Sequence, residues 1–390
     1  MRGPVCLGES AGAISVTSGT WAFFGPMGER DLGPSKAERG RARPANGLIV
    51  TDVFHPDADA GKLGSLGVLH LRRLWSRTLA RRAGALQTPD EPAEWVEHEV
   101  VMRGLQVDLR ETFAVLYDEA PSFPAFERWI LAKNGGAIEP ERIARINAAL
   151  RGEPVPAEDD DDYEPVFRPD DLAFWDEHGY VVLHDAVPAE NCAAAEDAIW
   201  SFLEMDRDDP STWYHGRHGH SIWVPLLHHP ALWANRRAPR VRRAFAQLWN
   251  RRDLWVTVDQ VGFNPPERPG WRFPGPHLHW DASLAPPVPF GLQGLLYLVD
   301  VAPDQGAFTC VPGFHRRIET WLRELPPHAD PRGQDLAALG PVPVAGRAGD
   351  LVIWHHALPH GSSPNRAQRP RIVQYVKMHP SRWEHHAAWK

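Results

Sequence analysis

The triplet His279-Trp280-Asp281 has the residue types and the spacing of a metal site. In an extended segment the side chains of residues i and i+2 point to one face, about 6.6 Å apart along the strand, so His279 and Asp281 can reach the same ion. The pair alone is weak evidence, because the chain contains 20 histidines and two further His-x-Asp triplets, which begin at His55 and His328. Both of those triplets lie in proline-rich loops.

A third imidazole and an arginine follow nearer the C-terminus, in the segment 350–371. A predicted strand leads to His360, and after one turn Arg371 opens the next predicted strand. Two imidazoles and one carboxylate form a facial triad, the ligand set that leaves positions on iron(II) open for a bidentate keto acid and dioxygen. The Arg371 guanidinium can bind the distant carboxylate of such a keto acid through two parallel hydrogen bonds.

Neighbouring residues compete with two of these candidates. His355 and His356 are rivals of His360 as the distal ligand. Arg369 is the rival of Arg371, but it precedes a proline and so belongs to the turn, whereas Arg371 enters the strand.

His277 lies on the same face of the predicted strand as His279, so these two imidazoles could themselves form a metal pair of the cupin type. No Glu follows within the next several residues to complete such a ligand set. We expect His277 to line the pocket or to support a metal ligand, with a purely structural position as the alternative.

Strand patterns dominate the chain after residue 165. The segments are short, rich in β-branched and aromatic residues, and separated by Gly, Pro, Asn and Asp turns. They cover residues 180–183, 254–263, 291–301, 307–311, 351–355 and 372–378, with helices expected near 190–203 and 241–249. Because few helices connect the strands, an antiparallel double sheet of the jelly-roll kind, over residues 166–390, is favoured over a doubly wound parallel sheet.

Residues 61–152 instead predict a small helical domain. Apolar residues recur at three- and four-residue spacing, which indicates four helices around 71–79, 102–116, 122–133 and 139–150. Asn134-Gly135-Gly136 is a helix stop signal, and Pro140 suits the first turn of the next helix. The acidic, proline-rich segment 153–165 is expected to be a linker. Residues 1–60 form a poorly defined N-terminal segment, and its start, residues 1–21, is interpreted as a loose terminus rather than a secretion signal.

The composition excludes several classes of protein. With 43% apolar and 24% charged residues, the chain has the make-up of an ordinary globular protein. The formal net charge of −8 disfavours a nucleic-acid partner, and no apolar run reaches the roughly 18 residues that a membrane span needs. Three cysteines without a CxxC pair argue against a disulfide scaffold or a Cys-rich zinc module, so a cytoplasmic location fits best.

Five arginines gather on one short stretch of the predicted helical domain: Arg72, Arg73, Arg77, Arg81 and Arg82. This basic surface could dock an acidic partner such as a carrier protein or the acidic linker, with a solvated charged face as the alternative, and the helical domain could also support self-association. A second cluster, 213–220, alternates glycine with aromatic and histidine residues. Its position ahead of the strands suits a loop that covers the substrate, or a polar surface loop.

Taken together, the motifs resemble the phytanoyl-CoA dioxygenase family of iron(II)/2-oxoglutarate-dependent oxygenases over about residues 165–380. The resemblance rests on the His-x-Asp pair, on a distal histidine in the context His-Gly-Ser-Ser-Pro-Asn, on an arginine eleven residues beyond it, and on Gly-Ala-Phe-Thr-Cys-Val-Pro-Gly-Phe-His at 306–315. The segment Phe-Trp-Asp-Glu-His-Gly-Tyr-Val-Val-Leu-His-Asp-Ala-Val at 174–187 is similar to the family's first strand and turn.

The resemblance implies a double-stranded β-helix, the cupin-like form of a jelly roll, with iron(II) bound by His279, Asp281 and His360. The family context selects His360 over its histidine neighbours. It also implies that Arg371 binds the C5 carboxylate of 2-oxoglutarate.

Three further residues are expected near this cosubstrate. Asn264 and Ser362 match positions where members of the family often touch 2-oxoglutarate. Gln260 lies on the same strand face as Asn264 and is expected to line either the cosubstrate or the substrate site.

The activity that the resemblance implies is hydroxylation of an unactivated C–H bond in a small to mid-sized organic metabolite, with succinate and CO2 as co-products. Halogenating relatives replace the metal-binding carboxylate by a small residue, so Asp281 favours hydroxylation and leaves desaturation or ring formation open. The expected partners are a small-molecule substrate and dioxygen. A cupin-like metal-dependent isomerase or metal-binding module that does not use 2-oxoglutarate is the alternative, and a non-enzymatic interaction protein is another.

Overall fold

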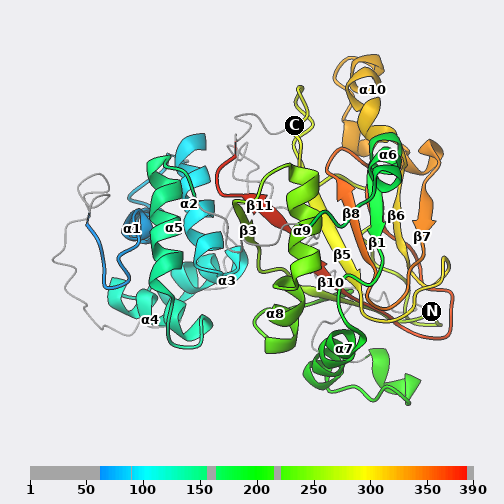
Figure 1. The fold of residues 1–390 in the computed structure, drawn as a ribbon, viewed down its shortest axis with the longest axis horizontal. Helices are drawn as coiled ribbons and strands as arrows, with labels where there is room; N and C mark the ends of the chain where they lie inside the picture. The colour runs from blue at the N-terminus through cyan, green and yellow to red at the C-terminus, as the bar shows by residue number, and fades with distance from the viewer. Residues whose placement is uncertain (1–61, 89, 156–163, 215–220, 384–390) are drawn as a thin grey trace, which may run out of the picture.

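The computed structural model describes residues 62–88, 90–155, 164–214 and 221–383. The predictions for residues 1–60, for the acidic run 158–162 and for most of the cluster 213–220 therefore lie outside the described residues. We call residues 62–155 the helical region and residues 164–383 the β region. Figure 1 shows the helical region beside the strands, and β3 (Leu254–Val256) and β11 (Met378–Pro380) lie between it and the main sheet.

Five α-helices occur in the described part of the helical region: α1 (Leu71–Arg82), α2 (Pro92–Gly104), α3 (Leu109–Ala114), α4 (Phe123–Lys133) and α5 (Pro140–Arg151), with a π-helical turn over Val115–Glu119. Their apolar faces pack into one core, which also takes in Trp255 of β3. α4 ends at the predicted stop signal, and Pro140 begins α5, so both of these boundaries are confirmed.

The expectation of one helix over residues 102–116 is wrong. α2 ends at Gly104, the backbone of Gln106 has a positive φ of 53°, and α3 begins after Asp108. The Asp108 carboxylate accepts the backbone N–H of Glu111 at 2.8 Å and so caps a new helix. The apolar spacing continues through this break and therefore could not reveal it.

The strands of the described β region form antiparallel sheets, as predicted. The main sheet has the order β1 (Tyr180–Leu183), β8 (Leu351–His355), β5 (Leu292–Tyr297), β10 (Arg371–Val376), β4 (Val261–Asn264) and β2 (Trp223–Val224). A second sheet has the order β7 (Val342–Val344), β6 (Phe308–Cys310) and β9 (His360–Ser362), and β11 pairs with β3. The helices of this region are α6 (Pro169–His178), α7 (Ala189–Leu203), α8 (Pro230–Arg236), α9 (Pro239–Trp249) and α10 (Ile318–Glu324), with 3-10 turns at Pro210–Tyr214, Phe314–Arg316, Pro331–Gly333 and Leu336–Leu339.

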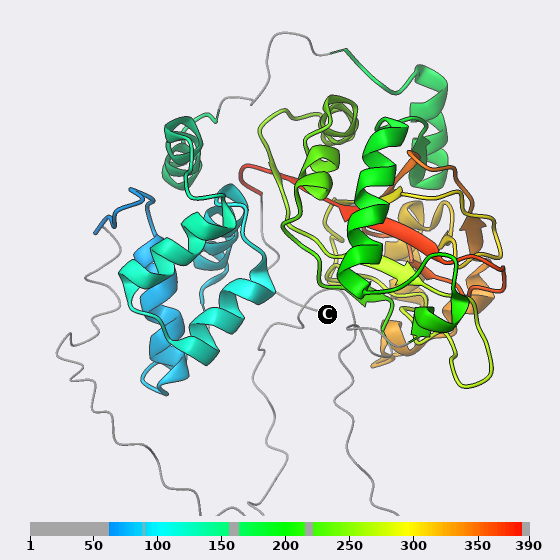
Figure 2. The ribbon, with the colours of Figure 1, turned by 90° about the horizontal axis from the view of Figure 1, so that it is seen from below.

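Both faces of the main sheet are covered. On one face, Leu292 and Leu296 of β5 belong to a core shared with α7, α8 and α9. On the other face, Leu295 and Tyr297 belong to a core shared with β6 and β7 of the second sheet. Alternate residues of one strand therefore serve two cores, which is why β5 is apolar along most of its length. Figure 2 shows the layers from below, with the helical region to one side.

Two of the predicted strands are each divided in the structure. The segment 254–263 contributes β3 and β4, and the segment 372–378 contributes β10 and the start of β11. β3 and β11 pair only with each other and lie against the helical region, because Trp255 packs into its core. A period-2 pattern reports which residues share a face, and it does not report which strand is the neighbour.

The arginines of α1 have partners inside the helical region. Arg73 pairs with Glu97, Arg77 and Arg81 pair with Asp90 at 3.1 and 2.6 Å, Arg82 donates to the carbonyl of Tyr117, and Arg72 lies over the ring of Phe123. These contacts hold the helical region together. Docking of a carrier protein and self-association through the helical region stay predictions. Among the described residues, no helix is both long and apolar enough to cross a membrane.

Candidate metal centre and cosubstrate site

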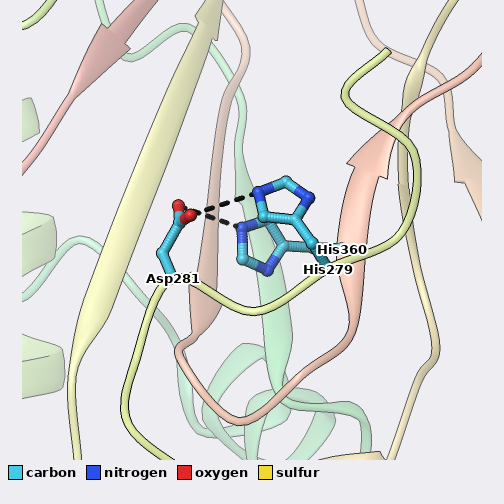
Figure 3. A group of neighbouring side chains, drawn as sticks. All are labelled: His279, Asp281 and His360. Carbon is cyan, nitrogen blue, oxygen red and sulfur yellow. Dashed lines mark ion pairs between the residues drawn. The ribbon is translucent and has the colours of Figure 1, made fainter. Parts of the chain in front are cut away.

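His279, Asp281 and His360 converge on one point (Figure 3). His360 begins β9, and its backbone pairs with that of His279 through hydrogen bonds of 2.9 and 3.0 Å, so the two imidazoles lie side by side. Oδ1 of Asp281 lies 3.2 Å from Nε2 of His279, and Oδ2 lies 3.5 Å from Nε2 of His360. One ligand atom from each residue lies within 4.8 Å of the other two. The predicted triad therefore comes together from three separate positions in the chain.

The backbone sets which nitrogen of each imidazole faces this point. Nδ1 of His279 lies 2.7 Å from the carbonyl oxygen of His277, and Nδ1 of His360 lies 3.0 Å from that of Leu358. A carbonyl only accepts, so Nδ1 of each imidazole carries a proton and donates it, and in the neutral form of the ring the lone pair is on Nε2. Metal-binding imidazoles are oriented in this way. Two such imidazoles and a carboxylate fit a divalent metal of the first transition row.

Gln293 of β5 orients the carboxylate. Its Nε2 donates to Oδ2 of Asp281 at 2.6 Å, and its Oε1 accepts the indole N–H of Trp354 at 3.0 Å. Because Trp354 is buried and its ring is held by packing, this chain of two hydrogen bonds fixes the amide and thereby the carboxylate.

The charges of the triad favour metal binding. Burial opposes ionisation of Asp281, but hydrogen bonds with His279 and His360 outweigh it and hold the pKa of the carboxyl well below its usual range. Burial also disfavours a charged His279, yet its hydrogen bond with Asp281 raises the pKa of that imidazole. For His360 burial dominates and lowers the pKa. At neutral pH the carboxylate is thus ionised and the deeper imidazole neutral, the forms that bind a metal, and a metal ion at this point would displace the proton that Nε2 of His279 shares with Asp281.

Arg371 is fully buried at the start of β10, where it pairs in register with Asn264 of β4. None of its three guanidinium nitrogens has a hydrogen-bond partner among the described residues, and neither has Oδ1 of Asn264. A buried charge without a partner costs about 3–5 kcal/mol. An anionic ligand would remove this cost, and a carboxylate matches the fork of guanidinium donors.

A cavity of about 260 Å³ lies beside the triad, and Gln260 and Ser362 line it together with the three candidate ligands. Asn264 and Arg371 are not among its lining residues. Arg371 does share a face of β10 with Tyr375, which lines the cavity. Aromatic side chains form much of the remaining wall: Trp223, Phe308, Trp354, Tyr375 and His379.

The rival histidines lie outside the triad. His355 packs near His315 and Phe290, with ring centroids 5.3 and 5.1 Å away, and burial lowers its pKa to about 3. Burial likewise lowers the pKa of His356 to about 4. His277 is exposed, and its ring lies edge-on to Phe273 while its carbonyl supports His279. The cupin-type pair of His277 and His279 therefore does not form a ligand cluster among the described residues.

The arginine that competes with Arg371 in the sequence lies outside the sheet. Arg369 is exposed in the turn before β10, and its carbonyl accepts a hydrogen bond from Asn365 at 2.9 Å. Arg371, two residues on, is inside the sheet. The proline between them marks the boundary, as the sequence predicts.

Sequence reasoning missed Gln293 and its partner Trp354. Gln293 is the polar residue of the apolar strand Leu292–Tyr297, and this break in the pattern was the available signal. It also missed that residues of the helical region line the cavity: Glu99, Met102, Arg103, Val107, Asp108, Leu109 and Arg110. No local pattern marks such a contact.

Comparison with known proteins places the chain in a family. The model of the phytanoyl-CoA dioxygenase (PhyH) family matches residues 175–373, which is just over half of the chain and includes every predicted site residue. The chain belongs to this family, as the motifs indicate. The match does not reach the helical region.

Two curated relatives share about half of the chain. A Dictyostelium discoideum protein named "Putative phytanoyl-CoA dioxygenase" is 24% identical over 260 residues, which cover 53% of this chain and 74% of that protein. The "Ava biosynthesis cluster protein O" of Aspergillus versicolor is 23% identical over 245 residues, 53% of this chain and 75% of that protein.

Solved structures with a similar chain path include SnoK, described as a non-heme alpha ketoglutarate dependent carbocyclase from nogalamycin biosynthesis. It is 21% identical, with a TM-score of 0.41 over 55% of this chain and 84% of that chain. EctD from S. alaskensis, solved with 2-oxoglutarate and 5-hydroxyectoine, is 18% identical, with a TM-score of 0.41 over 57% of this chain and 80% of that chain. At these scores the likeness adds nothing to the family assignment.

Proposed function

We propose that this chain is an iron(II)- and 2-oxoglutarate-dependent dioxygenase. His279, Asp281 and His360 are its metal ligands, and Arg371 binds the C5 carboxylate of 2-oxoglutarate. The observation that carries the proposal is the combination of three converging ligand atoms with a fully buried guanidinium that has no acceptor among the described residues. The first feature fits iron(II), and the second fits a dicarboxylate cosubstrate.

Iron at this triad would supply activation of dioxygen coupled to decarboxylation of 2-oxoglutarate to succinate and CO2. The residues of the chain bind and orient the reactants. Gln293 holds the Asp281 carboxylate at 2.6 Å. Asn264 and Ser362 are proposed to contact the cosubstrate, and Gln260 to face the cosubstrate or the substrate.

The proposed architecture of residues 166–390 is a double-stranded β-helix. The antiparallel main sheet, the second sheet and the core between them support it. The proposed reaction is hydroxylation of a C–H bond in a small to mid-sized organic metabolite. Asp281 supports hydroxylation over halogenation because it keeps the third protein ligand, and the name of the Aspergillus versicolor relative supports a biosynthetic substrate.

The test is an anaerobic titration of the purified protein with iron(II) and 2-oxoglutarate. We expect the weak visible charge-transfer band of a chelated keto acid. In Arg371→Ala the band should appear only at a 2-oxoglutarate concentration about a hundredfold higher, since a charge-assisted bidentate pair is lost. The matched control is Arg369→Ala, two residues away but exposed, which should titrate like the wild type.

Each outcome decides between the alternatives. A band that weakens only in Arg371→Ala supports the proposed cosubstrate site. Iron binding without any band in the wild type would contradict the proposal and favour a cupin-like metal protein that does not use 2-oxoglutarate. A protein that binds no iron would contradict both.

A further inference from the structure

The cavity beside the triad is closed on one side by the helical region. Residues of α2 and α3 and of the segment between them line it together with the triad, in which His360 begins β9 and His279 and Asp281 lie between β4 and β5. These residues lie more than 60 positions before the start of the family match at residue 175. The helical region therefore adds a wall to the proposed active site that the matched part of the chain does not supply.

This wall is held in place by contacts between the two regions. Trp255 of β3 is buried in the core of the helical region, where the guanidinium of Arg145 lies 4.7 Å from its ring centroid. Nε2 of His228 lies 3.0 Å from a carboxylate oxygen of Glu111. Such packing and pairing fix α2 and α3 relative to the strands, so their side chains can select a substrate.

Arg103 on α2 is the residue of this wall best placed to bind a ligand. Its guanidinium lies 4.1 Å from the ring centroid of Trp383, and its Nη2 donates to Oε1 of Glu99 at 2.6 Å. Its Nη1 is buried and has no hydrogen-bond partner among the described residues. Stacking and the ion pair therefore hold the guanidinium still and leave one nitrogen ready to donate.

The acidic groups of the cavity are already engaged. Asp259 lies 3.1 Å from Nζ of Lys377, and Asp108 caps α3 by accepting the N–H of Glu111. Arg110 lines the same wall, and its charge interacts with the Asp108 carboxylate. The unpartnered polar atom that this wall offers is thus a donor on a cation, Nη1 of Arg103, which fits an anion.

We propose that the substrate binds between the triad and α2, and that its carboxylate or phosphate group is bound by Arg103. This inference rests on the proposed oxygenase function and names the class of substrate. The aromatic walls suit the remainder of such a molecule: Trp223 and Tyr375 lie with ring centroids 4.6 Å apart beside the triad. The substrate class is therefore a compound with an apolar or aromatic body and one anionic end.

The test is calorimetric titration of the anaerobic protein loaded with iron(II) and 2-oxoglutarate. The probes are 3-phenylpropionate, its neutral counterpart 3-phenylpropanamide, and phenyl phosphate. We expect at least one anionic probe to bind about tenfold or more tightly than the amide, the effect of one charge-assisted hydrogen bond. The tighter of the two anions distinguishes a carboxylate from a phosphate substrate.

Arg103→Gln should remove this preference by weakening the anionic probe about tenfold and leaving the amide unchanged. Arg151→Gln, an exposed arginine at the end of α5, is the matched control and should keep the preference. If Arg103→Gln does not fold, Arg103→Lys retains the charge without the fork, and it should lose the preference in part.

The outcomes separate this inference from the proposed function. Equal binding of acid and amide, an unchanged preference in Arg103→Gln, or no saturable binding of either anion would overturn the anion site even while the charge-transfer band is intact. If the band is absent but the preference exists and depends on Arg103, the anion site stands and the oxygenase proposal fails.

Discussion

The two regions of the molecule each hold a half-buried aspartate among basic side chains, and they use it differently. In the helical region Asp90 lies 3.1 Å from Nε of Arg77, 2.6 Å from Nη2 of Arg81 and 3.4 Å from Nδ1 of His98. In the β region the partners of Asp281 in Figure 3 are the Nε2 atoms of two imidazoles. Both carboxylates have a pKa below the usual range despite burial.

The difference lies in the chemistry of the groups that contact each carboxylate, guanidinium N–H donors at Asp90 and imidazole nitrogens at Asp281. A guanidinium has five N–H donors and no lone pair, so it can neutralise Asp90 but cannot bind a metal. A neutral imidazole whose Nδ1 is bound to a carbonyl offers the lone pair of Nε2. Of these two aspartates, Asp281 is the one that can share a metal with its histidines, because the carbonyls of His277 and Leu358 orient the two rings.

The largest expected effect comes from breaking the metal cluster. His279→Ala and Asp281→Ala should each reduce iron-dependent release of succinate to less than about 1% of wild type, because a two-ligand site does not retain the metal. Asp90→Asn is the matched control and should keep its iron content. Wild-type turnover in either triad variant would overturn the ligand assignment.

Loss of the hydrogen bond that orients Asp281 should have a smaller effect on the same site. Gln293→Leu should weaken iron binding about tenfold, because the carboxylate loses the hydrogen bond that orients it. Gln374→Leu removes another buried amide, whose partners are Asn235 and the carbonyl of Leu232, and should leave iron affinity unchanged. Competition with a chromophoric chelator measures both. Equal losses in the two variants would mean that Gln293 acts only through the fold.

Breaking the charge cluster around Asp90 in the helical region should lower the stability of the fold and not the affinity for the metal. Asp90→Asn is expected to lower the free energy of unfolding by about 2 kcal/mol, because Arg77 and Arg81 then share a half-buried site without their common counter-charge. Urea unfolding followed by circular dichroism checks this. An unchanged midpoint would show that the cluster contributes nothing to the fold.

The smallest expected effect is a change with pH in the stability of the helical region. Burial opposes ionisation of Glu97, but His70 and Arg73 lower its pKa from 4.5 to about 2. The ionised carboxylate therefore stabilises the folded state above about pH 4.5, and this contribution is lost as the pH falls toward 2. Between these pH values, the midpoint temperature of unfolding should change less with pH in Glu97→Gln than in wild type. Parallel curves would contradict the assigned shift.

Residue types and their local spacing were enough to predict the chemistry of the candidate site. Spacing placed His279 and Asp281 on one face, the proline after Arg369 separated it from Arg371, and family context singled out His360. These signals are local, because a period of two residues and a proline act on the chain within a few positions. For the same reason the strands β1 and β8 were predicted to the residue.

What lies across space from these residues depends instead on the packing of the whole chain. This packing placed Gln293 against Asp281, divided the segment 254–263 between two sheets, and brought Arg103 of the helical region to the cavity of the β region. Periodicity records the face on which a side chain lies. It does not record which distant segment packs against that face, because that choice depends on how all the apolar faces of the chain are buried together.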